Sequence, residues 1–213
     1  IYTQNTFPIV DGLSWQPDLG TQVLVLDKDD LKQQRLFELP PFAFFHLGDA
    51  WEESDGTIRF EACIEPDPTF ATTTARALVA GQRGPVTLPI LAQIALHADG
   101  RGEMVRTGIA AEFPRADHRR AGLARRYTIH TALYGQGPVA RGVGLFDWNS
   151  GTSTIHDFGP GQMVEEFVFA ADGAGEADGW LVGTTLNLAA GATELHVLRA
   201  GDVAGGPVAT WRG

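Results

Sequence analysis

One histidine in this sequence has a setting in which an imidazole could do chemistry. His46 follows the apolar run Phe42 to Phe45, which predicts a buried strand, and it stands where the sequence turns polar. We therefore expect the strand to end at His46 and a polar turn to follow it. An imidazole at the end of a buried strand can hydrogen-bond to the backbone or bind a metal through its neutral nitrogen. Spacing alone leaves both roles open and favours the hydrogen bond.

The other five histidines have no comparable setting. One lies beside a hairpin turn, one in an arginine-rich loop, and three within or beside predicted strands: His97, His118, His130, His156 and His196. None has a close-spaced cysteine, histidine or carboxylate of the kind that zinc sites use. The sequence also lacks a Gly-x-Ser-x-Gly elbow, a phosphate-binding glycine loop and a dinucleotide fingerprint. Structural roles are expected for these histidines, and hydrolase or nucleotide-binding functions have no support.

The block around His46 resembles the third iron-ligand motif of the carotenoid cleavage oxygenase family. That motif is a phenylalanine-rich strand carrying a ligating histidine, followed by an Asn-Ala-aromatic-Glu run. His46, Ala50, Trp51 and Glu52 match it, and Asp49 stands where the family usually has asparagine. Asp and Asn make similar turn hydrogen bonds. The resemblance implies that His46 is a metal ligand.

Two later blocks are similar to motifs of the same family. They are Glu112-Phe113-Pro114-Arg115 and, after Phe158-Gly159-Pro160-Gly161, the run Glu165 to Phe169. In the family, a glutamate of each block hydrogen-bonds a ligating histidine, which fixes the orientation of the ring. The resemblance carries this orienting role to Glu112 and Glu165. Glu166 is not chosen, because it aligns with a position that is normally proline.

Short apolar runs separated by turn residues predict the elements that position these side chains. Strands are expected at residues 21–26, 35–39, 42–47, 57–64, 90–97, 103–111, 127–134, 139–148, 153–157, 165–169, 180–186 and 194–199. Asp99-Gly100, between two of these runs, is a strong hairpin signal. The pattern indicates an all-β chain of short antiparallel strands, as a sandwich, barrel or propeller.

One long insert, Glu65 to Leu88, interrupts the strand pattern. It is rich in proline, and its small-residue stretch from Ala71 to Ala80 predicts one or two helical turns. Long inserts in β domains are often functional loops, although a plain surface excursion is equally consistent with the sequence. We interpret the insert as a substrate-entry element, which requires it to lie near His46.

Composition restricts the classes of partner. The 213 residues are 44% hydrophobic and 20% charged, which suits one globular domain over residues 1–213. The net charge of −10 argues against nucleic acid. A local basic cluster is interpreted as a solvated loop rather than an anion or membrane contact: Arg115, Arg119, Arg120, Arg125 and Arg126. No apolar run is long enough to cross a bilayer, and a cytoplasmic location is the expectation.

The resemblance implies a seven-bladed β-propeller of which this chain forms about half. Family members hold one Fe(II) on four histidines at the propeller centre. They use dioxygen to cleave a carbon-carbon double bond of a carotenoid, apocarotenoid or stilbene into two carbonyls, and a minority isomerise retinoids. Only one of the four ligand motifs is present here, so the chain alone is expected to be catalytically incomplete. Oligomeric state and the exact substrate are undetermined, and a peripheral membrane contact stays open.

Two functions of different classes therefore remain. In the first, the chain is the later half of an iron-dependent dioxygenase, with His46 as ligand and Glu112 and Glu165 as orienting groups. In the second, it belongs to a metal-free propeller that serves as an apolar-ligand or protein-interaction module. Loss of iron on substitution of His46 in the whole protein distinguishes them.

Overall fold

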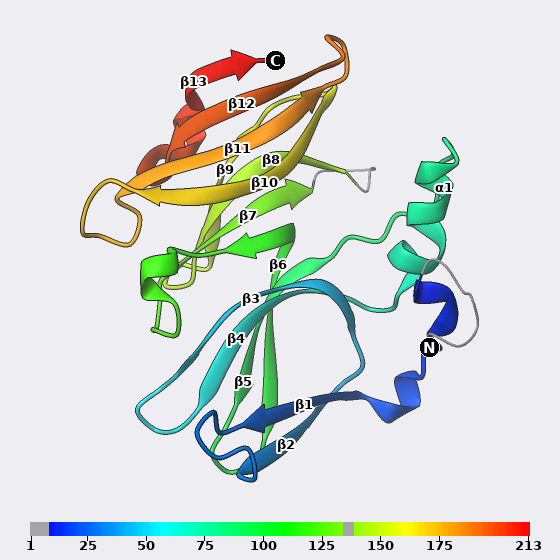
Figure 1. The fold of residues 1–213 in the computed structure, drawn as a ribbon, viewed down its shortest axis with the longest axis vertical. Helices are drawn as coiled ribbons and strands as arrows, with labels where there is room; N and C mark the ends of the chain where they lie inside the picture. The colour runs from blue at the N-terminus through cyan, green and yellow to red at the C-terminus, as the bar shows by residue number, and fades with distance from the viewer. Residues whose placement is uncertain (1–8, 134–138) are drawn as a thin grey trace.

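The computed structural model describes residues 9–133 and 139–213, which form an almost entirely β structure (Figure 1). Its strands are β1 (Thr21–Leu26), β2 (Gln34–Leu39), β3 (Ala43–Glu52), β4 (Ile58–Glu65), β5 (Ile90–Leu96), β6 (Gly102–Arg115), β7 (Tyr127–Leu133), β8 (Ala140–Asp147), β9 (Thr152–Asp157), β10 (Gln162–Ala171), β11 (Gly179–Asn187), β12 (Ala192–Arg199) and β13 (Pro207–Arg212). The short helical segments are η1 (Ile9–Gly12), η2 (Pro17–Leu19), η3 (Phe70–Thr74), α1 (Ala75–Val79), η4 (His118–Arg120) and η5 (Ala200–Gly205). The predicted strand residue Tyr134 lies outside the described residues.

The strands form successive antiparallel meanders, each pairing with its neighbour in sequence. β1 pairs with β2, β3 to β9 form one continuous sheet in numerical order, and β10 to β13 form a separate four-stranded sheet. The long strand β6 joins two meanders, because its first part pairs with β5 up to Ala110 and its last part pairs with β7 from Ala111. Figure 1 shows these meanders following one another along the molecule. Such serial four-stranded meanders are the building plan of propeller blades.

The Asp-Gly pairs make the tight turns that the sequence predicts. Gly56 and Gly100 adopt φ values of 81° and 93°, which glycine reaches without a Cβ clash. The side chain of Asp99 accepts a hydrogen bond from the Arg101 N–H at 3.0 Å, closing the β5–β6 turn. The predicted hairpin is confirmed.

Two apolar clusters hold the meanders together. One contains Phe37 and Leu39 of β2 with Ile94 of β5, so the β1–β2 hairpin packs on the face of the β4–β5 sheet. The other contains Val143 of β8 and Leu181 of β11, both fully buried, so it joins the middle meander to the last one. Burial of a leucine-sized side chain contributes about 1.5–3 kcal/mol.

Two sequence expectations need correction. The strand containing His46 does not end there, because β3 continues to Glu52. As the first strand of its sheet, β3 has one edge without a strand partner among the described residues. β13 was not expected, because Pro207 opens it directly after Gly205-Gly206. Proline is tolerated at the first position of an edge strand, and among the described residues β13 pairs with β12 alone.

The insert between β4 and β5 contains the expected helical turns. A single turn of π-helix, η3, runs directly into α1. Figure 1 shows this segment at one side of the molecule, beside the N-terminal η1. Within residues 9–133 and 139–213, no helix combines the length and apolarity needed to cross a bilayer.

Candidate metal-ligand site

Two consecutive β-bulges in β3 set the position of His46. The pairing with β4 shifts between Phe44 and Leu47 and again between Leu47 and Ala50, so an extra residue is accommodated at each step. His46 lies inside the first bulge. Bulges bend a strand and redirect side chains, and they occur preferentially next to functional sites. The burial pattern agrees, because Phe44, Phe45 and Leu47 are all exposed instead of alternating.

Glu112 of β6 holds one nitrogen of the His46 ring. The His46 Nδ1–H donates to Glu112 Oε2 at 2.7 Å, across 66 residues of sequence. The same oxygen accepts from the backbone N–H of Phe113 at 3.0 Å. Phe113 makes this bond from the left-handed region, with φ of 52°, a conformation that costs a non-glycine residue about 1–3 kcal/mol. The backbone next to Glu112 therefore adopts an unfavourable conformation in which its N–H can hydrogen-bond to the carboxylate.

The surroundings of Glu112 are largely dry. Burial raises the pKa of its carboxyl group, while the hydrogen bonds from the Phe113 N–H and from His46 lower it. Its second oxygen, Oε1, is buried and has no hydrogen-bond partner among the described residues. A buried carboxylate that a histidine Nδ1–H approaches fixes the tautomer, so the lone pair of the neutral ring is on Nε2.

The His46 ring is packed on one side and open on the other. The Phe113 ring lies 4.3 Å from it, centroid to centroid. The His46 side chain nevertheless keeps 41% of its surface exposed, compared with 15% for Glu112. No hydrogen bond to Nε2 arises within the part of the chain that the structure describes. The exposed part of the ring is thus the part free to bind a ligand.

A small apolar pocket of about 150 Å³ adjoins His46. Its walls are mainly aromatic and aliphatic: Phe45, Phe70, Pro89, Phe113 and Leu133. Phe70 of η3 meets Phe45 edge to face at 5.4 Å, so the insert lies beside His46, where the interpretation as an entry element requires it.

The pocket also contains Glu65, a residue that sequence reasoning did not select. Glu65 is buried at the end of β4, and its Oε2 receives a long hydrogen bond of 3.5 Å from Thr87. Burial and the negative charge of Glu112 raise the pKa of Glu65 to about 7. The only sequence signal was a carboxylate ending an otherwise apolar strand, Ile58 to Glu65.

Glu165 lies elsewhere, on β10. It is exposed, and its Oε2 accepts a hydrogen bond from Thr184 of β11. A β-bulge falls between Val164 and Phe167, so Glu165 and Glu166 sit together in the irregular step. The neighbouring Glu166 forms an ion pair with Arg115. The structure does not bring Glu165 to His46, which leaves it available for a different partner.

Three of the remaining histidines, His97, His130 and His196, make structural contacts. His130 is completely buried between the Thr131 carbonyl and Ser153, and burial lowers its pKa to about 4. His97 pairs with Glu103 at 3.0 Å, and His196 bonds to Thr185 at 2.9 Å. Across the described ranges, no group of three or more histidine, cysteine or acidic side chains could hold a metal ion. The described residues therefore supply one candidate metal ligand and not a complete metal site.

The interpretation of the arginine cluster as a solvated loop is wrong for Arg125. Only 1% of its side chain is exposed, because it enters the protein to pair with Asp49 and Glu61. The other four form ion pairs with nearby carboxylates at the surface: Arg115 with Glu166, Arg119 with Asp117, Arg120 with Glu176 and Arg126 with Asp147. The difference lies in the partner, because Glu61 is itself buried, with 1% of its side chain exposed.

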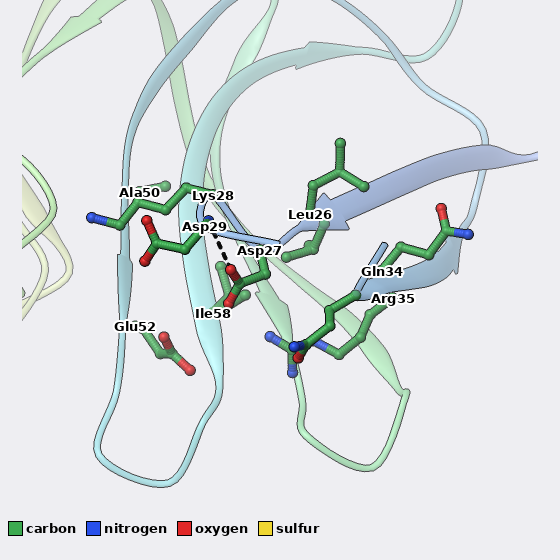
Figure 2. Close-up of a pocket in the computed structure, with 11 residues that line it drawn as sticks. Leu26, Asp27, Lys28, Asp29, Gln34, Arg35, Ala50, Glu52 and Ile58 are labelled. Atoms are coloured by element: carbon green, nitrogen blue, oxygen red, sulfur yellow. Dashed lines mark hydrogen bonds between the residues drawn. The ribbon is translucent and has the colours of Figure 1, made fainter. Parts of the chain in front are cut away.

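A larger hollow of about 950 Å³ lies between the β1–β2 turn and β3 and does not include His46 (Figure 2). Charged side chains surround it, among them Asp27, Asp29 and Glu52. Asp27 Oδ1 accepts from the backbone N–H groups of Asp29 and Asp30, both at 2.8 Å, so its carboxylate closes a local turn. The hollow is an open, charged surface feature unrelated to the histidine site.

Comparisons with known proteins agree with this fold. The model of the family described as retinal pigment epithelial membrane protein matches residues 4–212. An apocarotenoid-15,15'-oxygenase from Synechocystis sp. is 26% identical over 98% of this chain and 44% of its own length. A crystal structure of Synechocystis apocarotenoid oxygenase superimposes with a TM-score of 0.80 at 20% identity, and a cobalt-substituted form with 0.81 at 21%.

Each structural match covers 94% of this chain and 42% of the other. The chain thus spans less than half the length of the relatives it matches, and its meanders are blades of the same β-propeller fold. The expected resemblance is confirmed over nearly the whole sequence. The chain belongs to the carotenoid cleavage oxygenase family, represented by the retinal pigment epithelial membrane protein model and the apocarotenoid oxygenases.

Proposed function

We propose that this chain is part of a non-haem Fe(II) dioxygenase that cleaves a carbon-carbon double bond of a carotenoid, apocarotenoid or stilbene-type substrate. His46 would be one iron ligand, and the remaining ligands would come from outside residues 1–213. The observation that carries the proposal is the 2.7 Å hydrogen bond between His46 Nδ1 and Glu112 Oε2. A carboxylate on the far nitrogen is the usual partner of a metal-binding histidine.

The residues around His46 fit a neutral imidazole ligand. Glu112 takes the Nδ1 proton and fixes the ring, so that Nε2 can offer its lone pair to a cation. Imidazole nitrogen is a suitable ligand for iron. When bound, the iron would activate dioxygen, which adds one oxygen atom to each carbon of the cleaved double bond. Both atoms of O2 are then accounted for in the two carbonyl products.

The protein side chains beside the ring would exclude water and receive an apolar substrate. Phe45, Phe70 and Phe113 present aromatic surface next to His46. Polyenes and stilbenes are flat and apolar, and such surfaces favour them over polar ligands. The apocarotenoid oxygenase relatives support a polyene as the substrate class.

Glu165 would serve a second ligand. Its carboxylate is exposed on β10 and accepts a hydrogen bond from Thr184, with a free approach on its outer side. We assign it to orient an iron-binding histidine that lies outside this sequence. Its distance along the fold from β3 is consistent with a site whose ligands come from several blades.

Replacement of His46 in the whole protein tests this function. His46→Ala should abolish bound iron and double-bond cleavage while the melting temperature stays close to that of the wild type, because the side chain is partly exposed. His97→Ala is the matched control, since His97 also pairs with a glutamate but lies at the β5–β6 turn. It should keep both iron and activity.

The iron content of purified protein separates the two classes of function. If the wild-type protein binds no iron, and His46→Ala leaves binding of an apolar ligand intact, the metal-free module replaces the oxygenase. Stoichiometric iron and normal turnover in His46→Ala would also refute the role of His46.

A further inference from the structure

Three charged side chains form a network next to β3, in which Arg125 and Glu61 are buried and Asp49 is partly exposed. The guanidinium of Arg125 donates from Nη1 to Asp49 Oδ2 at 2.9 Å and from Nε to Glu61 Oε1 at 3.2 Å. Arg125 precedes β7, Asp49 belongs to β3 and Glu61 to β4. The network therefore connects the strand of His46 to its neighbour and to the loop that follows β6.

The Arg125–Glu61 pair is closed to solvent, which therefore cannot replace either partner. The side chains of Arg125 and Glu61 are each 1% exposed. The guanidinium also lies 4.9 Å above the Trp51 ring. Removing a charge from water costs several kcal/mol of folding free energy unless the charge is well paired. The guanidinium of Arg125 must therefore stay beside its carboxylate partners.

Arg125 acts on the second β3 bulge, which directly follows the bulge of His46. That bulge spans Leu47 to Ala50 and contains Gly48 and Asp49. Gly48 passes so close to Glu61 that an added Cβ would meet Glu61 Cβ and Oε2, each at 2.9 Å. Asp49 is pulled towards Arg125, and Trp51 packs beneath the same guanidinium. The backbone immediately after His46 is therefore held by contacts at Gly48, Asp49 and Trp51.

β3 is held from both ends of the segment that runs from Glu112 to Arg125. Glu112 of β6 holds the His46 ring, and Arg125, in the loop that follows β6, holds the backbone after it. A ring held only by Glu112 could still rotate with the strand. With the bulge fixed as well, the Nε2 direction is determined.

We propose that Arg125 is a positioning residue for His46: through Asp49 and Glu61 it fixes the second bulge of β3 and thereby the direction in which the imidazole presents Nε2. The consequence for metal binding rests on the proposed function, whereas the geometry of the ring can be measured without metal. Positioning groups around a metal ligand typically affect affinity about 10–100-fold.

Two variants of the whole protein test this assignment. Arg125→Met removes the centre of the network. Asp49→Ala removes its link to β3, together with the hydrogen bonds that Asp49 accepts from the Ala50 and Gly122 N–H groups, while the Arg125–Glu61 pair stays. Asp49→Asn keeps a hydrogen-bond acceptor and serves as the conservative variant. Arg126→Met is the matched control, because Arg126 is the next residue and pairs with Asp147 at the surface instead of with β3.

The first measurement is solvent exchange of the His46 Nδ1–H in histidine-selectively labelled, metal-free protein, followed by NMR. Exchange should be about tenfold faster in Arg125→Met and Asp49→Ala, because local opening of the ring becomes easier. Asp49→Asn and Arg126→Met should match the wild type. If Arg125→Met does not fold, the exchange rate in Asp49→Ala decides whether Arg125 positions His46.

The second measurement is the iron dissociation constant of the folded variants. It should rise about tenfold or more for Asp49→Ala and stay within twofold for Arg126→Met. Unchanged exchange in Asp49→Ala and in folded Arg125→Met would overturn the positioning role. Altered exchange in a protein that binds no iron would support the positioning role and would contradict only the proposed oxygenase.

Discussion

At the scale of single residues, the resemblance to family motifs selected His46 and Glu112 but not their full environment. The structure shows the hydrogen bond between them that the family resemblance implied. Glu65 and Arg125 were not predicted as parts of the site, because their importance depends on burial by distant strands. A carboxylate at a strand end and an arginine in a basic loop look like solvated residues in a sequence.

Glu65 gives the protein a specific dependence of stability on pH. Its folded pKa, about 7, lies above the ordinary value of 4.5. The folded protein therefore keeps a proton that the unfolded chain has already released. The stability that this proton contributes is complete below about pH 4.5 and is lost as the pH rises through about 7.

Glu65→Gln should remove this dependence, because glutamine does not titrate. Urea unfolding at pH 5 and pH 8 measures the free energy of unfolding of the wild type and of Glu65→Gln. The wild type should lose more unfolding free energy than Glu65→Gln between these two pH values. An equal loss would show that Glu65 is ionised in the folded protein.

At the scale of elements, alternation and turn residues predicted nearly every strand, including the β5–β6 hairpin. The errors have local causes. β3 was ended too early because its two bulges break the period of two that identifies strands. The second bulge contacts Glu61 and Arg125, which follow Asp49 by 12 and 76 residues in the sequence, so no local pattern could reveal it.

Gly48→Ala should destabilise the protein by about 1–3 kcal/mol, which is typical of an added methyl group in a packed interior. The new Cβ would meet Glu61 at 2.9 Å. Gly201→Ala is the control, since its Cβ would have only the Ala177 carbonyl oxygen nearby, at 3.9 Å. Denaturant unfolding compares the two variants. Equal stabilities would mean that β3 does not pass as close to Glu61 as the structure shows.

At the scale of the whole molecule, the strand pattern in the sequence left a sandwich, a barrel or a propeller open. Strand order decides among them, and it depends on pairings between meanders, such as the switch of β6 from β5 to β7 at Ala110–Ala111. The family resemblance supplied that arrangement, and the structural matches confirm it. The same meander order places His46 on the first strand of its sheet.

The position of the metal in the whole protein tests the central claim most directly. Crystals of the iron-loaded protein, measured with X-rays at the iron absorption edge, should show an anomalous peak within bonding distance of His46 Nε2, with Glu112 still hydrogen-bonded to Nδ1. A peak bonded to other side chains while His46 Nε2 faces solvent would contradict the assignment of His46 as an iron ligand.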